Sequence, residues 1–271
     1  MNAEFLEGLK PDEYPYDVHY ATELRSIFDE CFLRELTNTE KKALNKITFV
    51  PLLFGNRSGS NLLTECLHLS GMGFPNHGEP MNTPSVKKIS ERHQIKTFTD
   101  YFLFLIRRYQ RNNVIGFKMG INQLFDLTRT GLTQHFGNVK LLQSLRHDRL
   151  AQAVSHYIAK ASGSWSTMQK QELSNDPPYS AEAILRFLRR GARLEADSRL
   201  FMTIHGTPSL EVWYEDFVKD AKTQVRAIAD FLGCEADVNS VNLTTTAVQP
   251  QTRAINVQYA NRFRNEMRMN A

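Results

Sequence analysis

Four apolar stretches rich in β-branched and aromatic residues recur along the chain, and a helical pattern follows each of them. They lie at residues 47–54, 113–119, 139–145 and 210–217, and they have the length and composition of strands covered on both faces. Pro51 weakens the first assignment, because proline cannot donate to the hydrogen-bond ladder of a sheet. The alternation predicts an α/β fold with a mostly parallel central sheet flanked by helices.

The predicted helices lie at about 60–69, 147–161 and 220–233, and Gly233 is expected to cap the last of them. Nearer the N-terminus, one apolar stripe at helical spacing predicts a helix within an N-terminal helical extension, residues 1–45. The stripe consists of Leu24, Ile27, Phe28, Cys31, Phe32 and Leu36.

The length of the chain is compatible with one large α/β domain, and we expect a single domain over residues 1–271. The 33 basic and 29 acidic residues give a net charge of +4, which is too mild to indicate a nucleic-acid partner. Cys31, Cys66 and Cys234 predict buried free thiols in a reducing compartment. The N-terminus is too acidic for a signal peptide, and no apolar run approaches the roughly 18–20 residues that a bilayer requires. We therefore expect a soluble cytoplasmic protein without an integral membrane segment.

The loop GNRSGSN, residues 55–61, connects the first predicted strand to its helix. Such a loop directs several backbone N–H groups and the positive end of a helix at one point, which suits an oxyanion. It is not the kinase loop GxxxxGK, because Arg57 precedes the second glycine and no lysine follows Gly59. Arg57 could bind a phosphate or sulfonate bidentately, with hydroxyls from Ser58 and Ser60. An ordinary surface turn with a serine N-cap is the alternative.

A second candidate element is SLRHDRLAQAVSHYIAKASGSW, residues 144–165. Arg146 ends a predicted strand, Asp148 is a plausible N-cap, and Ser155 lies about two turns into the helix. The carboxyl edge of an open α/β sheet is where ligands bind. Taken alone, Arg146 could equally form a surface salt bridge.

Together these stretches resemble a known family. NRSGSNLL, then RHDRLAQAVS with ASGSW behind it, and then VWYEDFVKDAKTQVRAIADFLG are similar to the bacterial carbohydrate sulfotransferases typified by trehalose 2-sulfotransferase. These enzymes are relatives of the wider sulfotransferases that use 3'-phosphoadenylyl sulfate (PAPS). The resemblance runs in patches from about residue 48 to about 264. Residues 1–45 and 85–112 carry no recognisable signal of it.

The resemblance implies a P-loop-like sulfotransferase fold and a PAPS site, with PAP as the product and no metal. It implies that Arg146 and Ser155 bind the 3'-phosphate. The residues that it implies for the 5'-phosphosulfate are Arg57, Ser58, Gly59, Ser60 and Asn61. Arg57 is our candidate for stabilising the bridging and sulfuryl oxygens. Arg253 falls where sulfotransferases bring a late loop over the nucleotide.

The catalytic base is less clearly marked. The family is thought to use a glutamate in a GxPxE-like segment, whereas this chain has GFPNHGEP, with Glu79 two residues later and His77 in between. Either side chain could take the proton of the acceptor hydroxyl, or both could merely line a loop. Lys118 could contact the acceptor or the sulfuryl group, or cap a strand edge in solvent. Trp165 could stack on a sugar.

The expected reaction is in-line transfer of the sulfuryl group to a hydroxyl of a carbohydrate or glycoconjugate. The loops at 71–112 and 163–180 would determine the acceptor. Two alternatives remain open from the sequence: a divergent P-loop kinase, and a non-catalytic relative that binds a nucleotide or glycan. The resemblance also allows a homodimer.

Overall fold

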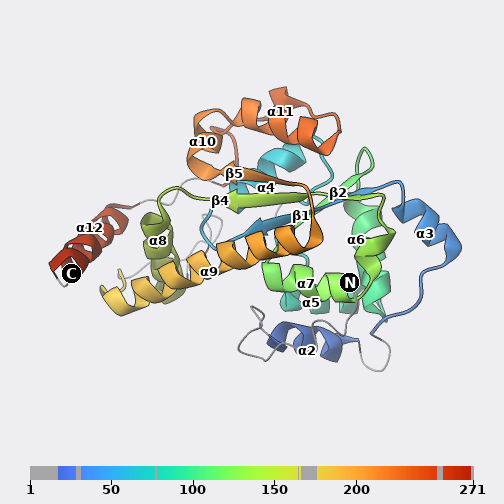
Figure 1. The fold of residues 1–271 in the computed structure, drawn as a ribbon, viewed down its shortest axis with the longest axis horizontal. Coiled ribbons are helices and arrows are strands. Elements are labelled where there is room, and N and C mark those ends of the chain that lie inside the picture. The colour runs from blue at the N-terminus through green and yellow to red at the C-terminus, as the bar shows by residue number, and fades with distance from the viewer. Residues whose placement is uncertain are drawn as a thin grey trace.

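The computed structural model describes residues 18–28, 32–76, 78–163, 165, 176–248 and 253–269. Within this part of the chain, five parallel strands form one sheet with the order β2-β1-β4-β5, and β3 pairs with β1 (Figure 1). Their bounds are β1 Thr48–Phe54, β2 Val114–Met119, β3 Asn138–Val139, β4 Leu141–Leu145 and β5 Ser209–Trp213. The predicted α/β class with a mostly parallel sheet is confirmed.

Helices cover both faces of the sheet (Figure 1). One face carries α4 (Ser60–Leu69), α10 (Tyr214–Lys219) and α11 (Ala221–Leu232), and the other carries α6 (Phe98–Tyr109) and α7 (Ile121–Arg129). Beyond these two lie α2 (Val18–Ile27) and α5 (Thr83–His93), while α3 (Asn38–Leu44) leads into β1. At the other end of the sheet, α8 (Arg149–Ser162), α9 (Ala181–His205) and α12 (Ala254–Met269) pack together. Two short 3-10 helices are Leu132–His135 and Val238–Ser240.

The central strand β1 divides the apolar core into two parts, because successive side chains of a strand point to opposite faces. Phe49 and Leu53 pack in the cluster that contains α6 and α7. Val50 and Leu52 pack in the cluster that contains α4 and α11. Among the described residues, no helix has both the length and the apolar character needed to cross a bilayer.

Pro51 lies inside β1, although a proline is unfavourable in a central strand. The strand that pairs with β1 on this side is interrupted next to Pro51. Lys140 N donates to Phe49 O at 3.0 Å. In a regular parallel ladder, the N–H of residue 51 would then donate to the carbonyl of Lys140. Proline has no N–H group, so the ladder breaks there and the predicted strand 139–145 appears as β3 and β4 on either side of Lys140.

Two elements differ from the predictions. The apolar stripe predicted one N-terminal helix, but α2 ends at Ile27 and residues 32–36 are not helical; Cys31 lies outside the described residues. The described residues of the predicted apolar stripe still pack together, because Leu24, Phe28 and Leu36 belong to one cluster. The predicted strand 210–217 ends at Trp213, where α10 begins. Residues 85–112, which carried no signal of the family resemblance, contain most of α5 and all of α6.

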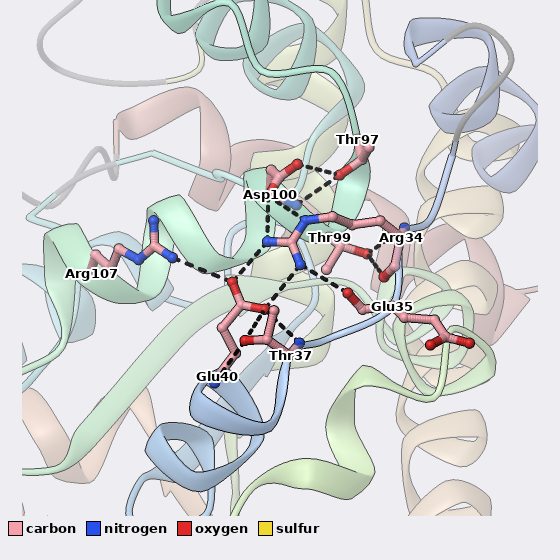
Figure 2. A network of polar contacts seen from close by, with 8 residues as sticks. All are labelled: Arg34, Glu35, Thr37, Glu40, Thr97, Thr99, Asp100 and Arg107. Atoms are coloured by element: carbon pink, nitrogen blue, oxygen red, sulfur yellow. Dashed lines mark hydrogen bonds and ion pairs between the residues drawn. The ribbon is translucent and has the colours of Figure 1, made fainter.

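A polar network holds the segment before α3 against α6 (Figure 2). The Arg34 guanidinium donates to both carboxylate oxygens of Glu40, at 2.9 and 2.8 Å, and its Nε donates to Asp100 at 2.8 Å. Thr37 caps α3 in a capping box with Glu40. The hydrogen bonds from Arg34, opposed by partial burial, hold the pKa of Glu40 at about 2.

We expect Arg34→Met to lower the free energy of unfolding by about 1–3 kcal/mol near pH 7, because the Glu40 carboxylate loses its cationic donor. The pKa of Glu40 is depressed on folding from 4.5 to about 2, so its contribution is present above the unfolded value and is lost as pH falls through the folded value. Urea unfolding at a series of pH values should therefore show the difference between wild type and variant shrinking from about pH 5 towards pH 2. A difference that stays constant over this range would contradict the assignment.

Candidate active site

The carboxyl ends of β1, β2 and β4 open into one cavity of about 290 Å³. The loop after β1 contributes Arg57 and Gly59, β2 contributes Lys118, and the turn after β4 contributes Arg146. Because parallel strands end at the same edge of a sheet, residues far apart in sequence meet here. The structure thus brings the loop motif and the Arg146 motif of the sequence into one site.

A buried contact between two serine hydroxyls holds the loop 55–59 to β4. The Ser58 hydroxyl is only 1% exposed and lies 3.0 Å from the Ser144 hydroxyl. Ser58 therefore does not line the cavity, although the sequence grouped it with the phosphosulfate residues. The first hydrogen bond inside α4 runs from Leu63 N to Gly59 O, so the N–H groups of the first turn have no acceptor within the helix.

Arg57 and Arg146 converge on this loop. Arg57 has a left-handed backbone, with φ 67°, and its Nε donates to the Ser155 hydroxyl at 2.9 Å and its Nη1 to Trp165 O at 2.8 Å. Arg146 Nη1 donates to the Arg57 carbonyl at 3.3 Å. Burial, with the nearby positive charge of Arg146, lowers the pKa of Arg57. Two cations close enough to oppose each other make a site that favours an anion.

The first turn of α10 holds Arg146 in place. Glu215 Oε1 lies 3.5 Å from Arg146 Nε, and Glu215 Oε2 accepts from His147 N at 2.9 Å. The Tyr214 ring lies under the Arg146 guanidinium, 4.8 Å from its carbon, and lines the cavity. These contacts give Glu215 a structural role, and Tyr214 faces the site.

On the other side of the cavity, Glu79 and Lys118 form an ion pair. Lys118 is 4% exposed, and its Nζ lies 3.1 Å from Glu79 Oε1. The same Nζ donates to Asn61 Oδ1 and lies 4.8 Å from the centre of the Phe54 ring. Burial lowers the pKa of Lys118, and Glu79 opposes this effect. Lys118 is therefore not a solvent-exposed strand cap, which was the alternative that the sequence left open.

The loop that carries Glu79 is fixed from three helices. The Tyr20 hydroxyl of α2 donates to Met81 O, and the Tyr101 hydroxyl of α6 donates to Pro80 O. Asn82 donates to Glu79 Oε2 and accepts from Gln123 of α7 at 2.9 Å. His77, the other candidate base, lies outside the described residues.

Helix α12 forms a wall that the sequence did not predict. Asn256, Val257, Ala260, Asn261 and Arg264 line the cavity from it. Arg264 Nη2 lies 3.6 Å from Asp148, which also caps α8 as predicted. Arg253 is not among the lining residues and instead binds Asp176 at 2.7 Å. The tail has several arginines at irregular spacing, so nothing in the sequence alone distinguished Arg264 from Arg253.

Trp165 lines the cavity with its side chain 5.8 Å from the ring of His156, measured between ring centres. His156 is buried, and its Nε2 lies 3.2 Å from Asn56 Nδ2 in the loop. Burial, with positive charge from Arg190 and Arg57, lowers the pKa of His156 to about 4. A neutral imidazole can accept from Asn56, so His156 helps to hold the loop. Within the described residues, no group of three or more His, Cys, Asp or Glu side chains is arranged to bind a metal ion.

Comparison with protein families identifies the class to which this fold and site belong, the sulfotransferases. More specifically, the chain belongs to the Stf0 sulphotransferase family, whose model matches residues 52–266. The predicted resemblance is therefore confirmed. No curated protein matches the chain.

Several solved structures are similar to the protein. The sulfotransferase domain of the Synechococcus PCC 7002 olefin synthase has 19% identity and a TM-score of 0.45, over 80% of this chain and 86% of that one. Mouse sulfotransferase SULT7A1 complexed with PAP has 15% identity and a TM-score of 0.43, over 94% and 75%. A sulfotransferase from Alicyclobacillus acidocaldarius has 14% identity and a TM-score of 0.41, over 80% and 92%.

We expect Gly59→Ala to destabilise the protein by about 1–3 kcal/mol. Gly59 has φ 91°, and a Cβ there would overlap the Tyr214 ring. Gly191→Ala is the matched control, because Gly191 lies inside α9 with no atom within 4 Å of a built Cβ; it should stabilise by about 0.5–1 kcal/mol. Thermal unfolding of both variants measures the contrast, and equal midpoints would show that Gly59 is not constrained by Tyr214.

Proposed function

We propose that the protein transfers the sulfuryl group of PAPS to a hydroxyl of a carbohydrate or glycoconjugate and releases PAP. The observation that carries the proposal is the convergence of Arg57 and Arg146 with the N-terminus of α4 in one cavity. PAPS has two anionic groups at opposite ends of its ribose, so it needs two anion subsites. Membership of the sulphotransferase family supports this donor over ATP.

In this proposal, the first turn of α4 binds the 5'-phosphosulfate through backbone N–H groups, with Ser60 and Asn61 beside it. Arg146 and Ser155 bind the 3'-phosphate. The sequence assigned Arg57 to the sulfuryl group, but its hydrogen bond to Ser155 favours the 3'-phosphate end. Arg264 of α12 adds a cation that the sequence did not suggest.

The chemistry requires a base, an aligned acceptor and a cation near the transferring group. The acceptor oxygen attacks sulfur while the bond between sulfur and the bridging oxygen breaks, and PAP leaves with that electron pair. Glu79 takes the acceptor proton in this scheme. Lys118 lies next to Glu79 and Asn61, which makes it the cation best placed to stabilise the sulfuryl oxygens.

The acceptor is proposed from the family and from the lining of the cavity. Glu79 offers a carboxylate to a hydroxyl. The sequence suggested Trp165 for sugar stacking, but its carbonyl accepts from Arg57, so in this proposal Trp165 lies beside the donor. A carbohydrate hydroxyl has a pKa far above neutrality, so a positioned carboxylate matters for its deprotonation.

PAP should raise the thermal unfolding midpoint of the protein, whereas ATP with magnesium should have little effect, because only PAP carries the 3'-phosphate. Arg57→Ala and Arg146→Ala should each weaken PAP binding about tenfold to a hundredfold in calorimetric titrations, because each removes charge-assisted hydrogen bonds. Arg226→Ala, on the exposed face of α11, is the control. Stabilisation by ATP but not by PAP would refute the donor assignment and revive the kinase alternative.

Glu79→Gln should reduce transfer of labelled sulfate from PAPS to sugar acceptors by about a hundredfold to ten-thousandfold. The affinity for PAP should change little, because the substituted group acts on the acceptor. Gln is close in shape, so the fold should persist, which the thermal midpoint checks. Turnover at the wild-type rate would remove Glu79 as the base, and no transfer by the wild type to any sugar would favour a non-catalytic relative.

A further inference from the structure

Glu65 is a buried carboxylate that the proposed reaction does not use. It lies in the second turn of α4 and is 5% exposed. Its Oε1 accepts from Ala247 N at 2.7 Å, and its Oε2 accepts from Val248 N at 3.0 Å. A buried charge is stable only when donors satisfy it. Here the donors are two successive backbone N–H groups, so Glu65 binds a specific piece of main chain.

That main chain belongs to the segment that follows α11, and one of its residues borders the cavity. Thr246 is buried, and its hydroxyl contacts Leu243 O at 2.9 Å and Val248 O at 3.2 Å. Val248, the residue bound by Glu65, lines the cavity, as does Leu62 of α4. Glu65 and Thr246 therefore hold Val248, an apolar wall of the cavity, through its N–H group and its carbonyl respectively.

We propose that Glu65 is a positioning residue for the donor nucleotide. Helix α4 would then serve the donor twice: its first turn binds the anion, and its second turn fixes Val248 beside the bound nucleotide. This inference rests on the proposed function, because it takes PAPS as the ligand of the cavity. Glu65 contacts neither donor nor acceptor in this account and acts only through the segment 246–248.

The proposal makes a prediction opposite in sign to simple electrostatics. Removing a negative charge near a polyanion should tighten binding if the charge acts through space. A glutamine at this position replaces one acceptor oxygen by an NH₂ group that faces a backbone N–H, so one hydrogen bond is lost and the wall is released. If Glu65 positions the wall, the substitution weakens binding instead.

The experiment is calorimetric titration of PAP into full-length wild type, Glu65→Gln and Thr246→Val. Both variants should bind PAP about fivefold to tenfold more weakly. The KM for PAPS should rise in the same proportion while kcat stays within about twofold, because the wall does not touch the reacting atoms. Thr246→Val changes no charge and keeps the test available if Glu65→Gln does not fold.

Glu40→Gln is the matched control, because Glu40 is also a carboxylate held by hydrogen bonds but lies in the network beside α3. It should lower the thermal midpoint and leave PAP affinity unchanged. Tighter or unchanged PAP binding in Glu65→Gln, or unchanged binding in a destabilised Thr246→Val, would overturn the proposal. If PAP does not bind the wild type, the proposed function itself is refuted. If PAP binds the wild type and the variants equally, only the positioning role of Glu65 is refuted.

Discussion

The site depends on keeping two like charges together at the carboxyl edge of the sheet. Arg57 and Arg146 oppose each other, and burial adds to the effect on Arg57. Neutral acceptors and one carboxylate hold them there: Ser155, the Trp165 carbonyl, and Glu215. A bound anion between the two guanidinium groups would relieve this repulsion. Helix α8 provides Ser155 and α10 provides Glu215, so both helices place partners of the two arginines beside the end of β4.

On the opposite side of the cavity, a buried lysine is stabilised by a carboxylate. Lys118 is nearly inaccessible to water, and its ammonium remains charged only with partners nearby. Glu79 supplies the opposite charge, while Asn61 and the Phe54 ring complete its surroundings. Since Asn61 belongs to the first turn of α4, a single buried cation connects the anion loop to the proposed base.

Much of the fold was predictable from local patterns. The apolar runs located four of the strands, and Gly233 ended α11 at the expected place because its φ of 74° suits glycine. The direction of the Arg57 side chain was not predictable, since it follows from a left-handed backbone at a non-glycine residue. Neither was the place of Arg264, because α12 carries several arginines, and it is the packing of Tyr259 and Phe263 against α8 and α9 that turns Arg264 towards the cavity. The pairing of Glu79 with Lys118 was not predictable either, because it depends on β2, which carries Lys118, lying next to β1 in the sheet.

The displaced glutamate is explained by the loop that carries it. Relative to the family's pattern, Glu79 comes two residues late, and the chain includes Gly78 with φ 93° just before it. Glycine adopts a positive φ without strain, so Gly78 allows the chain to turn directly before Glu79. The hydrogen bonds from Tyr20 and Tyr101 then fix the carbonyls of Met81 and Pro80. The position of the proposed base is thus set by tertiary contacts rather than by spacing along the chain, and Lys118 and Asn82 hold its carboxylate.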